Sequence, residues 1–202
     1  LHPVGNRLAL EGIVEAASAQ GYGTSLIHWS SLAPQSAEDE GPSIMRLGEM
    51  SIDAAIIIVS SSTRSGSAIS QLGPLTVPTV MLGTTVAGDV ASVGIDQTTG
   101  TREAVQHLLD LGHRTVHHIT GPKTSVHSQG RQHAWRATLQ TNGCAVPEPI
   151  QGDWSPTSGY VATKELLRGE PPTAIFAAND QMALGAYRAI LAEGLRIPED
   201  VS

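Results

Sequence analysis

Short apolar runs alternate along this chain with longer stretches whose apolar residues recur at helical spacing. A clear run covers 174–178 (Ala-Ile-Phe-Ala-Ala), which is too short for a helix and typical of a strand buried on both faces. Asn179 and Asp180 follow it, and both are residue types that commonly cap helix N-termini. Apolar residues then recur along one helical face as far as Leu191. This segment predicts a strand, a polar junction and a helix.

The same alternation extends over the whole chain. The predicted strands lie at 24–29, 54–59, 77–82, 91–95, 115–119 and 174–178, with a short strand or extended connection at 147–152. The predicted helices lie at 6–20, 36–49, 65–72, 98–111, 127–141, 157–167 and in the segment after Asn179 and Asp180. Residues 196–202 have the pattern of an approach to a further strand. Repeated strand and helix units predict an α/β fold with parallel sheets flanked by helices.

These units fall into roughly equal halves, which predicts two similar lobes. The best boundary lies near Ile95 to Gln97, and we expect one lobe to cover 1–95 and the other 96–202. Two lobes joined by strand crossovers form a cleft that can close on a ligand. In a parallel sheet, ligands bind beyond the carboxyl ends of the strands, where Asn179 and Asp180 are expected to lie. Either residue can also serve only as a helix cap.

Composition and charge narrow the possible functions. The chain has 40% hydrophobic and 15% charged residues, which is typical of a globular protein. Its net charge is −7 with 12 Lys plus Arg and no basic run, so these residues by themselves should not bind nucleic acid. No apolar run is long enough to span a membrane and no signal peptide opens the chain, so we expect a cytoplasmic protein without a membrane partner. Because residue 1 is a leucine, further sequence can precede it.

The motifs of catalytic and metal sites are missing from the sequence. It contains no Gly-x-Ser-x-Gly, Gly-x-Gly-x-x-Gly or Walker motif, so we expect neither an enzyme nor a cofactor. His113, His117 and His118 are close in sequence, but adjacent residues of a strand point to opposite faces. No acidic or thiol partner has ligand spacing, so no metal site is expected. Cys144 beside Gly143 is expected to be structural.

Several short phrases occur in a defined order over residues 93–202. They are Val-Gly-Ile-Asp at 93–96, His-Leu-Leu-Asp-Leu-Gly-His-Arg at 107–114, Thr-Gly-Pro at 120–122, Arg131 four residues before Trp135, Gly-Asp-Trp-Ser at 152–155, Ser-Gly-Tyr at 158–160, and the segments 172–185 and 194–202. Their order and spacing resemble the LacI/GalR (lactose-repressor) family of bacterial transcription regulators. The earlier part matches less sharply, and Ala54 stands where the family commonly has glycine.

The resemblance implies a two-lobed fold like that of periplasmic sugar-binding proteins, commonly dimeric, with a small effector in the cleft. It also implies that a separate N-terminal helix-turn-helix domain binds the operator. In the family, that domain and a first strand precede the helix that corresponds to the one near Asn6, and a further strand with an acidic pair follows the position that corresponds to Ser202. The chain is therefore expected to be an effector-binding core that is truncated at both ends, and a galactoside or other small saccharide is the expected effector.

A saccharide needs planar bidentate groups for its hydroxyls and an aromatic wall for its apolar face. The resemblance implies that Arg131 and Asn179 contact the effector, whereas an arginine in general more often forms a surface salt bridge. Trp154 matches an aromatic position beside the sugar, although it can also be a core residue. Trp135 is expected in the core, at helical spacing from Leu139.

Further candidates come from neighbouring positions. His127 lies one turn before Arg131, where the lactose-repressor subgroup has a small polar residue. Ser60 and Ser125 lie in loops after strands and are weaker effector candidates. Asp96 and Asp180 are expected to be hinge or cap residues.

Two other functions remain open at this point. A periplasmic sugar-binding protein that serves a transporter has the same fold, and a signal peptide before Leu1 would favour it. An enzyme built on the same layers would turn over a glycoside. A helix-turn-helix before Leu1 would favour the regulator.

Overall fold

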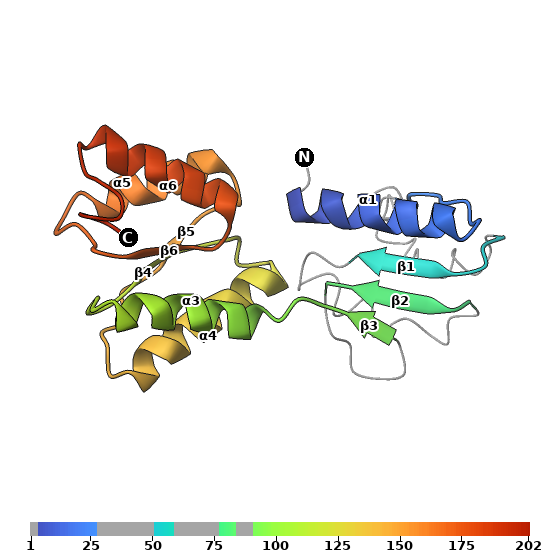
Figure 1. Cartoon of the computed structure of the whole chain (residues 1–202), viewed down its shortest axis with the longest axis horizontal. Helices are drawn as coiled ribbons and strands as arrows, with labels where there is room; N and C mark the ends of the chain where they lie inside the picture. Colours follow the sequence, from blue (N-terminus) through green and yellow to red (C-terminus); the bar gives the residue numbers. More distant parts are fainter. Residues whose placement is uncertain (1–3, 28–50, 59–76, 84–90) are drawn as a thin grey trace, which may run out of the picture. The chain divides into compact units, whose positions relative to one another are not determined.

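The computed structural model describes residues 4–27, 51–58, 77–83 and 91–202 of the chain. These residues divide into two compact units, the first reaching Gly94 and the second running from Ile95 to Ser202. Each unit contains a three-stranded parallel sheet, and helices flank the sheet of the second unit (Figure 1). The predicted α/β class with parallel sheets is therefore confirmed.

In its described residues, the first unit contains one helix and a sheet with the order β1-β2-β3. Its elements are α1 (Val4–Ala19), β1 (Ala55–Ile58), β2 (Thr79–Leu82) and β3 (Ala91–Val93). Met81, in the middle strand, is fully buried. The strand predicted at 24–29 does not form in the described part, 24–27, where Leu26 is 74% exposed and no backbone hydrogen bond to another described residue occurs. The helices predicted at 36–49 and 65–72 lie outside the described residues.

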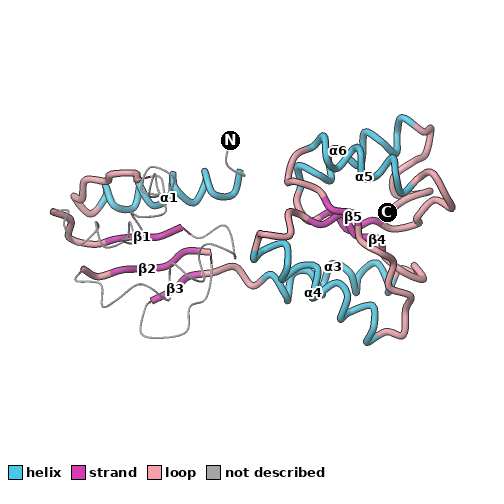
Figure 2. The backbone as a smooth tube through the Cα atoms, turned by 180° about the vertical axis from the view of Figure 1, so that it is seen from behind, coloured by secondary structure: helices cyan, strands magenta, loops and turns pink. Residues whose placement is uncertain are grey.

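The second unit has the strand order β5-β4-β6, with helices on both faces of the sheet (Figure 2). Its elements are α3 (Gln97–Asp110), β4 (His117–Thr120), α4 (Val126–Thr141), β5 (Ile150–Gln151), α5 (Pro156–Leu166), β6 (Ile175–Ala177) and α6 (Asp180–Ala192). Helices α3 and α4 pack on one face, and α5 and α6 on the other. Every element predicted over 98–192 is present, with ends shifted by only a few residues.

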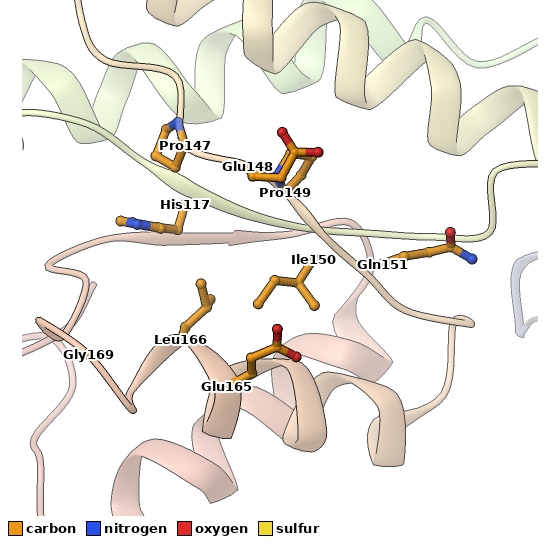
Figure 3. A pocket seen from close by; sticks show the side chains of 9 residues that line it. All are labelled: His117, Pro147, Glu148, Pro149, Ile150, Gln151, Glu165, Leu166 and Gly169. Atoms are coloured by element: carbon orange, nitrogen blue, oxygen red, sulfur yellow. The ribbon is translucent and has the colours of Figure 1, made fainter.

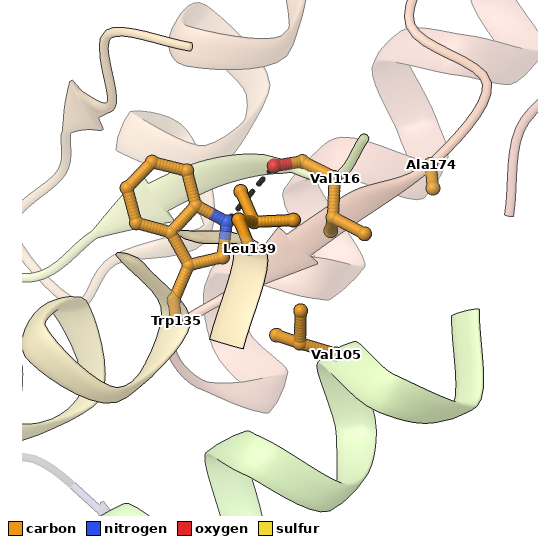
Figure 4. Packing of buried hydrophobic residues seen from close by; sticks show 5 residues of the cluster. All are labelled: Val105, Val116, Trp135, Leu139 and Ala174. Carbon is orange, nitrogen blue, oxygen red and sulfur yellow. Dashed lines mark hydrogen bonds between the residues drawn. The ribbon is translucent and has the colours of Figure 1, made fainter. Parts of the chain in front are cut away.

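Alternation along β4 and its neighbours divides the apolar side chains between the two faces. The cluster beneath α3 and α4 consists of Val105, Val116, Trp135, Leu139 and Ala174 (Figure 4). Trp135 is fully buried there, and its Nε1–H donates to the carbonyl oxygen of Val116 at 2.8 Å. The cluster beneath α5 and α6 consists of Ile119, Ala162, Ala178, Met182 and Ala186. The predicted core position of Trp135 is confirmed.

Glycines allow α5 and α6 to approach each other closely. A Cβ atom at Gly185 would lie 1.9 Å from the carbonyl oxygen of Pro156, and one at Gly159 would lie 2.1 Å from that of Met182. The two helices therefore meet backbone to backbone.

The chain end extends the second sheet on the β6 side. The N–H of Ser202 donates to the carbonyl oxygen of Thr173 at 2.9 Å, and its own carbonyl oxygen accepts from the N–H of Ile175 at 2.8 Å. This is the pairing pattern of parallel strands, as expected for the approach predicted at 196–202. In the described ranges, no helix combines the length and the apolar character that a membrane span needs.

Candidate functional site

The candidate residues of the second unit gather at the carboxyl edge of its sheet. Ser125 and α4 follow β4, Trp154 follows β5, and Asn179 follows β6. Because all three strands are parallel, these junctions emerge at the same edge, where α/β proteins commonly bind ligands. Gln97, the first residue of α3, reaches the same group through its contacts with α4.

Arg131 connects the elements at this edge. Its Nε–H donates to Oε1 of Gln97 at 2.6 Å, and an Nη1–H donates to the carbonyl oxygen of Ala178. The guanidinium carbon lies 5.8 Å from the centre of the Trp154 ring, within the range of a cation–π contact. Burial lowers the pKa of Arg131, and the charge of Asp180 partly opposes this effect. No ion pair of Arg131 occurs within the described residues, so the alternative of a surface salt bridge does not apply there.

His127 lies one helical turn from Arg131 and shares its partner. Its Nδ1 is 3.2 Å from Nε2 of Gln97, and burial, followed by the charge of Arg131, lowers its pKa. Gln97 was not predicted as a site residue. The sequence signal that could have indicated it is a polar side chain at the start of a helix that follows a strand.

Asn179 is the N-cap of α6, and both polar atoms of its side-chain amide form hydrogen bonds. Its Oδ1 accepts from the N–H of Met182 at 2.8 Å, and its Nδ2 donates to the carbonyl oxygen of Trp154 at 3.1 Å. Asp180 was expected to be a hinge or cap residue, and of these two roles the cap belongs to Asn179 instead. Asn179 has the extended backbone that a cap requires (φ −153°, ψ 166°), whereas Asp180 is already the first residue of the helix.

Trp154 is half-buried and packs against the apolar cluster beneath α5 and α6. A Cβ atom at Gly121 would lie 2.3 Å from the Trp154 ring, so glycine is needed there to admit the indole. The backbone of Trp154 has a φ of 75°, which is uncommon for a bulky residue. The hydrogen bond from Asn179 to its carbonyl oxygen holds this conformation in place.

Two further candidates are helix caps. Ser125 is buried and caps α4, accepting from the N–H of Ser128 at 3.4 Å. Asp96 caps α3, accepting from the N–H groups of Thr98 and Thr99 at 2.9 and 3.0 Å. Hydrogen bonds from Thr99 and Thr98 lower the pKa of Asp96. Of the hinge or cap role expected for Asp96, the structure shows the cap, while Ser60 lies outside the described residues.

A separate hollow of about 580 Å³ lies beside β5 and the C-terminal part of α5 (Figure 3). Its lining includes His117, Glu148, Glu165 and Leu166, and both carboxylates are exposed to solvent. His117 and Glu165 lie toward the amino-terminal ends of the strands, so this hollow is distinct from the group around Arg131. None of the predicted site residues lines it.

Comparison with known proteins identifies the family of this chain. The family described as periplasmic binding proteins and sugar binding domain of LacI family matches residues 8–202. The lactose operon repressor of Escherichia coli (strain K12) is 39% identical over 127 residues, which are 62% of this chain and 35% of that protein. The chain thus spans about a third of the length of that repressor.

Solved structures agree with this match. A lac repressor dimer bound to operator and the anti-inducer ONPF has a TM-score of 0.80 at 30% identity, covering 96% of this chain and 66% of that one. A complex of the transcriptional regulator CelR with cellobiose has a TM-score of 0.73 at 30% identity, covering 95% and 58%. These relatives are named as repressors and regulators, not as enzymes. The chain therefore belongs to the LacI family of periplasmic-binding-protein-like sugar-binding domains.

Proposed function

We propose that this chain is the effector-sensing core of a bacterial transcription regulator and that it binds a small saccharide at the carboxyl edge of the second sheet. The convergence of Arg131, Asn179 and Trp154 at this edge carries the proposal. Each polar group keeps capacity for a ligand: the Asn179 amide uses one donor and one acceptor internally, and the Arg131 guanidinium has N–H groups beyond the two that are bonded. The Trp154 ring supplies an aromatic surface.

Regulation follows from a difference in affinity. An effector shifts a regulator between two states only if it binds one of them more tightly. The relative solved with operator and an anti-inducer supports a shift that changes operator binding. Because this chain has a net charge of −7, we assign the operator contact to residues outside 1–202.

The test is a thermal titration of the chain with cellobiose, methyl β-D-galactoside and ribose. A bound saccharide at about 100 times its Kd should stabilise the chain by about 2.7 kcal/mol. Arg131→Ala should weaken binding about tenfold, since it removes a charge-assisted donor. The matched control is Arg168→Ala, at an exposed position after α5, which should bind like the wild type. Equal affinity of folded Arg131→Ala and wild type would contradict the site, and a panel without any binder would contradict the proposed ligand class.

The contribution of Asn179 can be separated from its role as a cap. Asn179→Ser keeps a hydroxyl oxygen that can accept from Met182, so α6 should retain its N-terminus. It lacks the amide that offers a donor and an acceptor to a saccharide, so affinity should fall about tenfold, corresponding to about 1.4 kcal/mol. Calorimetric titration measures the affinity and circular dichroism checks the helix content. Unchanged affinity would mean that Asn179 only caps.

We also propose that the chain associates with a second copy through α6. Leu184, Tyr187 and Leu191 are 62%, 53% and 61% exposed and share one helical face. A relative of similar fold is a dimer, and such an apolar stripe suits a self-complementary contact.

Leu184→Glu should weaken this association at least tenfold, because it places a charge in the centre of an apolar contact. Sedimentation equilibrium measures the dissociation constant. Leu111→Glu changes an equally exposed leucine at the end of α3 and serves as the control. If both variants sediment like the wild type, α6 is not the contact surface.

A further inference from the structure

Gln97 lies between two of the candidate ligand residues and bonds to both. Its Oε1 is 2.6 Å from Nε of Arg131, and its Nε2 is 3.2 Å from Nδ1 of His127. Gly130 of α4 lies close to Gln97, since a Cβ atom added at Gly130 would lie 3.3 Å from Cβ of Gln97. All three side chains in this group are half-buried.

The chemistry of arginine determines which way the Gln97 amide faces. A guanidinium group only donates hydrogen bonds, so the atom of Gln97 that faces Arg131 is the carbonyl oxygen. The amide –NH₂ group then faces His127, and it too only donates. Nδ1 of His127 must therefore accept, which requires that it carries no proton. In a neutral imidazole, the proton is then on Nε2.

The surroundings of His127 favour the same state. Burial and the positive charge of Arg131 both disfavour a protonated imidazole and lower the pKa of His127. A protonated ring would place an Nδ1–H against the –NH₂ group of Gln97. Turning the amide to relieve this contact would place –NH₂ against Nε–H of Arg131, so no orientation of Gln97 satisfies both neighbours.

We propose that Gln97 is a positioning residue that orients the guanidinium group of Arg131 and sets the tautomer of His127. His127 then presents Nε2–H, a hydrogen-bond donor, and selects a saccharide with an acceptor oxygen at that position. This last step rests on the proposed function. The orienting role itself is a property of the chain without ligand.

The experiment is nitrogen NMR of the 202-residue chain labelled with ¹⁵N-histidine, without any saccharide, at neutral pH. His127→Gln assigns the signals by removing them. In the wild type, Nδ1 of His127 should be unprotonated and Nε2 protonated. Gln97→Glu should reverse this pattern at Nδ1, since a carboxylate accepts from both neighbours and requires Nδ1 to donate. Gln97→Met has neither group and should give averaged signals from both tautomers.

Gln106→Glu is the matched control, because Gln106 lies on the same helix and bonds to Asp110 and Asn142. It should leave the His127 signals unchanged. An Nδ1–H or averaged tautomers in the wild type would overturn the proposal, even if a variant failed to fold. Identical His127 signals in the wild type and folded Gln97→Glu would overturn it as well. Because no saccharide is present, these outcomes are independent of whether the proposed function fails.

Discussion

Gly185→Ala is expected to lower the free energy of unfolding by about 3 kcal/mol, although alanine favours helices in general. The added Cβ would lie 1.9 Å from the carbonyl oxygen of Pro156 and 2.8 Å from the backbone nitrogen of Tyr160. Both atoms belong to the backbone of α5, so no side-chain rotation can relieve the overlap. The two helices must separate, which opens the apolar cluster around Met182 and Ala186.

Urea denaturation measures this effect, with Gly100→Ala as a control of identical chemistry. Gly100 is exposed within α3, and a Cβ there would meet nothing within 4 Å. That variant should raise the free energy of unfolding by about 0.5–1 kcal/mol through helix propensity alone. If Gly185→Ala is as stable as the wild type, the close approach of α5 and α6 is incorrect.

Acidification from pH 7 to pH 4 should remove about 3 kcal/mol of stability through His118 alone. Burial lowers the pKa of His118 from 6.5 to about 4, which outweighs the opposing effect of its hydrogen bond to Phe176. Between these values the unfolded chain binds a proton that the folded chain does not. The contribution of this group to the free energy of unfolding is therefore fully present above pH 6.5 and is lost as the pH decreases toward 4.

The position of His118 explains the shift. It is 1% exposed, its ring stacks 4.9 Å from that of Phe176, and its Nδ1–H donates to the carbonyl oxygen of Phe176 at 2.7 Å. Its Nε2 is buried without a hydrogen-bond partner among the described residues, so a proton there would be an uncompensated charge.

His118→Gln and His118→Met replace the titrating imidazole, one by a polar side chain and the other by an apolar side chain. Each variant should be less stable than the wild type at pH 7 and should approach it toward pH 4, as measured by urea denaturation at several pH values. Parallel stability curves for the wild type and both variants would contradict a neutral, buried His118.

The local pattern of apolar residues was sufficient to predict the helices and strands of the second unit. The run at 174–178 and the helical spacing after it identified β6 and α6, because buried strands and amphipathic helices each have their own periodicity. The same reasoning failed at 24–27 (Thr-Ser-Leu-Ile), a strand candidate that forms no strand. A strand requires a partner, and the sequence pattern of one segment does not show whether a partner is present.

The residues of the candidate site were also predicted only in part from the sequence. The resemblance identified Arg131, Asn179 and Trp154, and the structure places them in one connected group. Which of Asn179 and Asp180 caps α6 could not be read from the sequence, because both types cap well and the backbone at the strand end decides. Gln97 was missed because its contact with Arg131 joins residues 34 positions apart.

The sequence by itself determined the α/β class, the elements of the second unit, the family and most of the candidate residues, since these depend on periodicity, turn chemistry and motif spacing. Only the tertiary structure decided how those residues act together. The Gln97 amide between Arg131 and His127, the glycine contact of α5 with α6 and the buried state of His118 each join segments that are distant in the chain. Their energetics depend on distances between elements and on exclusion of water, which no local pattern encodes.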